Sequence, residues 1–173
     1  MKRIILITGG QRSGKSTFAE EMVLSLSPHP VYIATAHIWD EEFRQRVRLH
    51  QARRGREWTT IEEERYLSRH DVSGRVVLVD CCTLWATNFI GDGAVDGGFD
   101  ADAVLGEMKD EFDRFTAQDA TFLFVTNEIG MGGTSPNAVQ RRFTDLLGRL
   151  NQYIARVADE VYLIVAGLNV KIK

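Results

Sequence analysis

Short apolar runs alternate along the chain with longer segments in which apolar residues recur at helical spacing. The runs are nearly continuous and rich in Val, Ile, Leu and Phe, which is typical of strands buried on both faces of a parallel sheet. They lie at residues 4–8, 31–35, 76–80, 121–126 and 161–166. The helical segments lie at residues 15–26, 40–54, 83–90, 102–116 and 138–157. This alternation predicts an α/β fold with a mostly parallel sheet flanked by helices.

The length of the chain favours one folding unit. Its 173 residues are 44% hydrophobic, which is enough for one compact core. The glycine- and aspartate-rich segment at residues 91–100, GDGAVDGGFD, is predicted to be a loop, and its ligand spacing does not match a calcium loop. No linker divides the chain, so we predict a single domain over residues 1–173.

Charge and cysteine content exclude several classes of protein. A formal net charge of -3 with 26% charged residues fits neither a disordered tail nor a strongly basic nucleic-acid binder. No apolar run approaches the roughly 20 residues that cross a bilayer. The only cysteines, Cys81 and Cys82, are adjacent and cannot form a multi-bridge scaffold. We therefore expect a cytoplasmic protein with no membrane span and no nucleic-acid partner.

A phosphate-binding loop follows the first predicted strand. The pattern G-x-x-x-x-G-K-[ST] needs a strand before it and a helix after it, and both are predicted here. Its backbone N–H groups and the helix dipole attract phosphate oxygens, while its lysine reaches the β- and γ-phosphates. The predicted nucleotide-binding residues of this loop are Gly9, Gly10, Gln11, Arg12, Ser13, Gly14, Lys15 and Ser16.

A magnesium site requires a second acid beside this loop. Asp80 ends the apolar run at residues 76–80, where the Walker B acid of a P-loop protein lies. On its own, an acid at a strand end is as often a helix cap or a solvated residue. Together with the P-loop, it predicts Mg²⁺ held by Ser16 and Asp80. A regulatory GTPase is disfavoured, because the segment beginning at Asn127 lacks the lysine and aspartate of an N-K-x-D motif.

An acid-free cluster of basic residues surrounds His50. On a helix, Arg46, His50 and either Arg53 or Arg54 share one face. Imidazole can act as a nucleophile, and flanking guanidinium groups would neutralise charge on an attacked phosphorus. The cluster's arginines are Arg44, Arg46, Arg48, Arg53, Arg54 and Arg56.

Spacing alone leaves His50 with a simpler interpretation. Trp39, Phe43 and Val47 form an apolar helical stripe that His50 extends, and the arginines can form a solvated face. From spacing alone, this structural interpretation is favoured. A nucleic-acid contact ranks lower, because no aromatic residues interleave with the arginines.

Taken together, the motifs resemble those of one family along essentially the whole chain. That family is the bifunctional adenosylcobinamide kinase/adenosylcobinamide-phosphate guanylyltransferase (CobU/CobP) family of cobalamin biosynthesis. The segments that carry the resemblance are, in chain order, ILITGGQRSGKSTFAE, YIATA, DEEFRQRVRLHQARRGREWTTIEE, VLVDCCTLWATN, VTNEIGMGG and GRLNQYIARVADEVYLIVAGLNVKIK.

The resemblance implies two consecutive reactions in a RecA-like P-loop fold. A kinase step moves the γ-phosphoryl group of ATP or GTP to adenosylcobinamide. In the second step, GTP guanylylates a histidine, and the GMP passes to adenosylcobinamide phosphate to give adenosylcobinamide-GDP. The resemblance also implies a homotrimer.

Site residues follow from the same resemblance by position. His50 matches the guanylylated histidine, which reverses the interpretation from spacing alone, and Lys15 is the other predicted catalytic residue. Because it shares a helical face with His50, and not because of the resemblance, Arg46 is a further candidate phosphate contact. Beyond the P-loop, the implied nucleotide contacts are Ala34, Thr35, Ala36, Gln51, Ala52, Arg53, Arg54, Glu62 and Asp80.

Two other functions stay open. The first is a P-loop kinase of small molecules in which His50 is structural. The second is a nucleotide-gated regulatory module without transfer chemistry.

Overall fold

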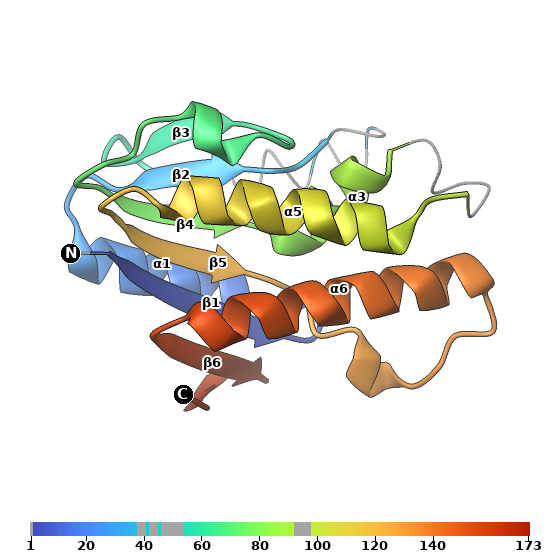
Figure 1. Cartoon of the computed structure of the whole chain (residues 1–173). Coiled ribbons are helices and arrows are strands. Elements are labelled where there is room, and N and C mark those ends of the chain that lie inside the picture. Colours follow the sequence, from blue (N-terminus) through green and yellow to red (C-terminus); the bar gives the residue numbers. More distant parts are fainter. Residues whose placement is uncertain (1, 38–40, 42–44, 46–53, 92–97) are drawn as a thin grey trace.

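A single sheet of seven strands runs through the described part of the chain. The computed structural model describes residues 2–37, 41, 45, 54–91 and 98–173. The strands are β1 (Arg3–Gly9), β2 (Val31–Ala34), β3 (Thr59–Glu62), β4 (Val76–Asp80), β5 (Thr121–Val125), β6 (Glu160–Val165) and β7 (Leu168–Lys171). Their order in the sheet is β3-β2-β4-β5-β1-β6-β7 (Figure 1). All neighbouring strands are parallel except β6 and β7, which form an antiparallel pair at one edge.

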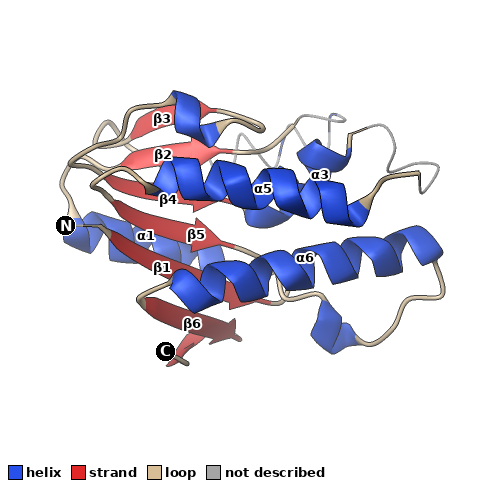
Figure 2. Cartoon of the chain, viewed as in Figure 1, coloured by secondary structure: helices blue, strands red, loops and turns tan. Residues whose placement is uncertain are grey.

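Helices cover both faces of the sheet. The described helices are α1 (Lys15–Leu26), α3 (Cys82–Ile90), α5 (Ala101–Thr116) and α6 (Ala138–Val157), with 3-10 turns η1 (Leu67–Arg69) and η2 (Gly130–Gly132). Figure 2 shows α5 and α6 on one face and α1 on the other. Asp100 and Asn137 begin α5 and α6 as N-caps, because each side chain accepts two backbone N–H groups of the first turn.

Two apolar cores lie on the two faces of the sheet. Alternate side chains of each strand point to opposite faces, so every central strand contributes to both cores. The larger core packs α3, α5 and α6 against the sheet, with Trp85 and Phe112 fully buried in it. The smaller core packs Ala19 and Val23 of α1 against Tyr32 and its neighbours on the other face.

The five predicted strands are all present, each within one residue of the predicted ends. The sequence analysis missed β3 and β7, which are the two edge strands. Both have only four residues, and both are largely exposed, so neither carries a continuous apolar run. The predicted α/β fold class, a mostly parallel sheet flanked by helices, is confirmed.

Four of the five predicted helices are present, as α1, α3, α5 and α6. The fifth, predicted at residues 40–54, lies largely outside the described residues, and so does most of the loop predicted at residues 91–100. Within the part of the chain that the structure describes, no helix is long and apolar enough to cross a membrane.

A cluster of charged groups joins the first strand to the last two. The carboxylate of Glu160 accepts hydrogen bonds from the Tyr162 hydroxyl at 2.6 Å, from Lys171 Nζ at 2.8 Å and from the Arg3 guanidinium. These three donors lower the pKa of Glu160 from an ordinary 4.5 to about 2. The charged form of Glu160 therefore stabilises the pairing of β1, β6 and β7.

This shift makes the contribution of Glu160 dependent on pH. Because its pKa is lower in the folded state, the stabilisation is complete above the ordinary pKa of 4.5 and is lost as the pH falls toward about 2. We expect Glu160→Gln to lower the free energy of unfolding at pH 7, and we expect this difference to shrink steadily below pH 4.5. Urea unfolding of both proteins at several pH values measures it.

Glu107→Gln is the matched control, since Glu107 lies on the exposed side of α5. This variant should differ little from the original protein at any pH. A Glu160→Gln effect that is equally large at pH 7 and near pH 2 would contradict the proposed role of the charge.

Candidate nucleotide site

The P-loop connects β1 to α1, as its motif requires. Two of its glycines have backbone conformations that other residues rarely adopt, with φ 155° at Gly9 and φ 98° at Gly14. A Cβ atom on Gly9 would also collide with the carbonyl oxygen of Ile164 in β6. Gly14 immediately precedes α1 and provides no side-chain cap, so the first N–H groups of that helix remain directed at the loop.

Neighbouring segments hold the P-loop from two sides. The N–H of Glu128, after β5, donates to Gly9 O at 2.9 Å, and the N–H of Gly167, in the β6–β7 turn, donates to Ser13 O at 2.8 Å. The Ser13 hydroxyl is buried and has no hydrogen-bond partner among the described residues. A phosphate oxygen in the loop would give this hydroxyl an acceptor, which fits the predicted ligand.

Lys15 is buried beside the loop, with 7% of its surface exposed. Its ammonium group donates to the Gly10 carbonyl oxygen at 2.5 Å. Burial lowers the pKa of Lys15, while the nearby Cys81 and Asp80 oppose that shift. A cation held in a poorly solvated position interacts strongly with an incoming phosphate.

Three side-chain positions form a row across the ends of neighbouring strands. In the sheet, Glu62 of β3 is in register with Ala34 of β2, and Ala34 is in register with Asp80 of β4. In-register residues of parallel strands point to the same face, which here is the face that α1 covers. This row lies where the carboxyl ends of β1 to β6 meet, and the P-loop leaves β1 at the same end of the strands. We call this end of the sheet the carboxyl edge.

The hydroxyl of Thr35, a predicted nucleotide-binding residue, is hydrogen-bonded to the backbone of Cys81 in the structure. The Thr35 hydroxyl donates to Cys81 O and accepts from Cys81 N, both at 2.8 Å, and Thr35 is fully buried. Asn88 of α3 adds a second link, because its amide donates to Thr35 O at 2.7 Å and to Glu64 O at 2.9 Å. These bonds hold the ends of β2, β3 and β4 together.

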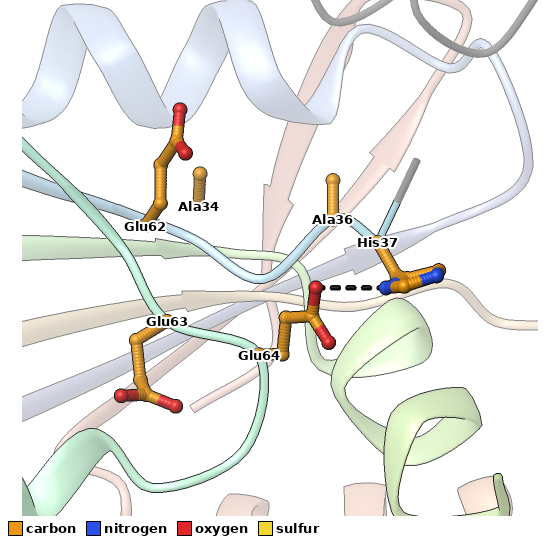
Figure 3. Close-up of a pocket in the computed structure, with 6 residues that line it drawn as sticks. All are labelled: Ala34, Ala36, His37, Glu62, Glu63 and Glu64. Carbon is orange, nitrogen blue, oxygen red and sulfur yellow. Dashed lines mark hydrogen bonds and ion pairs between the residues drawn. The ribbon is translucent and has the colours of Figure 1, made fainter. Parts of the chain in front are cut away.

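A pocket of about 390 Å³ opens beside this row (Figure 3). Its lining residues are Ala34, Ala36, His37, Glu62, Glu63 and Glu64. In Figure 3, Glu62 points to the same side as Ala34, whereas Glu64 pairs with His37 Nδ1 at 2.8 Å. Glu63 instead accepts from the N–H groups of Arg65 and Tyr66, so its role is to hold the turn before η1. Three predicted nucleotide residues, Ala34, Ala36 and Glu62, thus line one pocket.

Tyr32 is a residue that the sequence analysis did not select. Its hydroxyl donates to Asp80 Oδ2 at 3.1 Å, and the Arg54 guanidinium carbon lies 3.5 Å from the centre of its ring. Arg54 Nε and Nη1 are buried and have no hydrogen-bond partner among the described residues. Tyr32 thereby connects two predicted site residues, Asp80 and Arg54, that are distant in sequence.

Several predicted site residues lie outside the described part of the chain. These are Arg46, His50, Gln51, Ala52 and Arg53. Gln11 and Arg12 are described and exposed at the tip of the P-loop.

The residues predicted to hold magnesium suit that ion. A serine hydroxyl, a carboxylate and phosphate oxygens are hard oxygen donors, which Mg²⁺ prefers. Ser16 lies in the first turn of α1, and Asp80 lies close enough to Lys15 to affect the pKa of that lysine. Within the described residues, no group of three or more His, Cys, Asp or Glu side chains could hold a metal alone.

The cysteines beside Asp80 do not provide a nucleophile. Burial raises the pKa of the Cys81 thiol to about 12 and that of Cys82 well above its ordinary value. Both stay protonated near neutral pH, and the thiolate is the reactive form.

Comparison with known proteins decides the family. A family model described as cobinamide kinase / cobinamide phosphate guanyltransferase matches residues 5–172. The chain belongs to this family. The resemblance found from the sequence motifs is therefore confirmed, as is the prediction that the chain is an enzyme of this kind.

Curated relatives of this cobinamide kinase family chain match it from end to end. It is 36% identical over 181 residues to the bifunctional adenosylcobalamin biosynthesis protein CobU of Escherichia coli (strain K12), covering 98% of this chain and 99% of the relative. It is 37% identical over 172 residues to the corresponding protein CobP of Pseudomonas aeruginosa, covering 97% of this chain and 96% of the relative.

A solved structure shares the fold of this cobinamide kinase family chain. A prototypical ATPase from the type III secretion system of pathogenic bacteria is 12% identical and has a TM-score of 0.55. The match covers 93% of this chain and 50% of the ATPase. At this identity the similarity shows the P-loop NTPase fold alone.

Removing the Thr35 hydroxyl should destabilise the folded protein. Thr35→Val keeps the shape but leaves two backbone groups of Cys81 without their partner, at a cost of about 1–3 kcal/mol in the free energy of unfolding. Thr35→Ser keeps the hydroxyl and should cost less. Urea unfolding measures both.

Thr116→Val is the control for this experiment. Thr116 is equally buried, but its hydroxyl donates only to the Phe112 carbonyl, which a helical N–H also satisfies. If Thr35→Val is no more destabilising than Thr116→Val, the Cys81 contacts contribute nothing specific.

Proposed function

We propose that this chain catalyses both reactions named for its family at the carboxyl edge of its sheet. In the first reaction, a hydroxyl of adenosylcobinamide attacks the γ-phosphorus of ATP or GTP, the nucleoside diphosphate leaves, and the hydroxyl proton is released. In the second, GMP is transferred from GTP to the resulting phosphate. One observation carries this proposal: the P-loop and the Glu62–Ala34–Asp80 row lie at the same carboxyl edge, where α1 begins.

The P-loop supports the kinase reaction. Its backbone N–H groups and the Lys15 ammonium group lie where the β- and γ-phosphates would bind. Ser16 and Asp80 would hold Mg²⁺, which supplies positive charge to the phosphate oxygens. The buried nitrogens of Arg54 provide a further anion contact, because an unpaired guanidinium is costly to bury without an acceptor.

His50 is the proposed nucleophile of the second reaction. A ring nitrogen attacks the α-phosphorus of GTP, a P–N bond forms, and pyrophosphate leaves. A phosphate oxygen of adenosylcobinamide phosphate then attacks that phosphorus, the P–N bond breaks, and the imidazole is restored. Arg46, Gln51, Ala52 and Arg53 are proposed GTP contacts near His50 in sequence.

The setting of the enzyme completes the proposal. We propose a single domain over residues 1–173 that works in the cytoplasm, without a nucleic-acid partner, as a homotrimer. A group of exposed apolar side chains on β6, β7 and the strand end that follows supports an interface between copies of the chain. These side chains are Val165, Leu168, Val170 and Ile172.

A labelling experiment tests the histidine. GTP labelled on the α-phosphate should give a protein adduct that is labile in acid, because a P–N bond hydrolyses readily once protonated. His50→Ala should abolish this adduct. The control variant, His29→Ala, should be labelled as strongly as the original protein. An adduct that persists in His50→Ala would contradict His50 as the nucleophile, and the absence of any adduct in the original protein would favour a kinase in which His50 is structural.

The role of Lys15 is tested by turnover. Lys15→Ala should lower kcat/KM for phosphorylation of adenosylcobinamide by about 10²–10³, since the removed charge acts on the transferred phosphoryl group. Lys2→Ala, at an exposed lysine, should leave the rate unchanged. Nucleotide binding without turnover on any corrinoid would instead support a regulatory module.

A further inference from the structure

Tyr32 makes three specific contacts within the smaller core. It is only 4% exposed and packs among the apolar residues that face α1. Its hydroxyl donates to Asp80 Oδ2, Arg54 lies over one face of its ring, and Trp58 packs edge-on with ring centres 6.0 Å apart. An ordinary core tyrosine needs only one hydrogen-bond partner for its hydroxyl. Here the partner, Asp80, and the stacked cation, Arg54, are both residues of the proposed nucleotide site.

The hydroxyl fixes one half of the Asp80 carboxylate. A phenol is a neutral hydrogen-bond donor near neutral pH, so it can donate to the carboxylate. Since Oδ2 accepts this hydrogen bond, the carboxylate is held in one rotamer, with Oδ1 left for another partner.

The ring fixes the plane of the Arg54 guanidinium. A separation of 3.5 Å between the guanidinium carbon and the ring centre is a stacked cation–π contact. Stacking uses the face of the guanidinium and leaves its N–H groups, which lie in the plane, free to donate. Nε and Nη1 are buried and unpartnered among the described residues, so they are available to an anion.

We propose that Tyr32 is a positioning residue that aligns the metal side and the phosphate side of one nucleotide site. Its hydroxyl orients the Asp80 carboxylate, and its ring orients the Arg54 guanidinium. This proposal rests on the proposed function, because it assigns Asp80 to magnesium and Arg54 to phosphate. It deepens that function by making one side chain link the two.

The two contacts can be removed separately. Tyr32→Phe keeps the ring and loses only the hydroxyl, so it should impair the response to Mg²⁺. We expect the Mg²⁺ concentration at half-maximal GTP binding to rise by about 5–10-fold, the net effect of losing one typical hydrogen bond. GTP affinity in EDTA should change less than about twofold, because the Arg54 stack remains. Binding of a fluorescent GTP analogue measures both quantities without turnover.

Tyr32→Leu removes both contacts. In this variant GTP affinity in EDTA should also fall, by about 3–10-fold, because the guanidinium loses its stacking partner. In the same assay, Lys15→Ala shows how far the GTP affinity falls when a P-loop contact is lost. The two Tyr32 variants should therefore differ in EDTA and resemble each other in their Mg²⁺ response.

Tyr153 of α6 offers a control with the same kinds of contact at a partly exposed position. Its hydroxyl donates to Asp113 at 2.7 Å, Lys109 Nζ lies 4.9 Å from its ring centre, and Phe112 packs edge-on against it. These contacts repeat those of Tyr32 on the opposite face of the sheet. Tyr153→Phe and Tyr153→Leu should leave both the GTP affinity and the Mg²⁺ response unchanged.

The outcomes separate this inference from the proposed function. If the original protein binds GTP with a Mg²⁺-dependent affinity and Tyr32→Phe behaves identically, the positioning role is wrong and the proposed function stands. A Mg²⁺ shift of the same size in Tyr153→Phe would show a general effect on stability and would also overturn the positioning role. If the original protein binds no GTP, both proposals fail.

Discussion

The parallel register of the central strands is the constraint on which the candidate site depends. Parallel strands place all their carboxyl ends at one edge, so residues that end different strands become neighbours. Register then decides which side chains share a face. Glu62, Ala34 and Asp80 form one row because their strands pair in register, although they are far apart in the chain. A shift of one residue in β2 would turn Ala34 to the other face and bring Thr35 into the row.

The polar groups at this edge are stable because the structure gives most of them specific partners. A buried hydroxyl or amide without a hydrogen-bond partner lowers the free energy of unfolding about as much as a typical destabilising point mutation does. Thr35 and Asn88 avoid that cost by bonding to backbone groups of neighbouring strand ends. Thr8, Ser13 and Arg54 each have a buried side-chain atom without a hydrogen-bond partner among the described residues. Ser13 and Arg54 lie where phosphate oxygens are proposed to bind, so their unmet hydrogen bonds and the proposed ligand are found at the same place.

Sequence patterns predicted the parts of the fold that depend on burial and missed those that do not. Central strands such as β4 are buried on both faces and therefore read as continuous apolar runs. The edge strands β3 and β7 are exposed and short, so their pairing depends on backbone hydrogen bonds that leave no apolar pattern. The P-loop was predictable because its motif fixes local geometry. Tyr32 was not, since within an apolar run it cannot be distinguished from an ordinary core residue.

The position of Arg54 bears on how one small chain could serve two reactions. Arg54 is anchored on Tyr32, which also contacts Asp80 on the P-loop side of the sheet. His50, the proposed nucleophile, precedes Arg54, the proposed phosphate contact, by only four residues in the sequence. A triphosphate is itself long enough to present its γ-phosphorus to one group and its α-phosphorus to another. The proposed kinase and guanylyltransferase reactions therefore require no second nucleotide-binding fold.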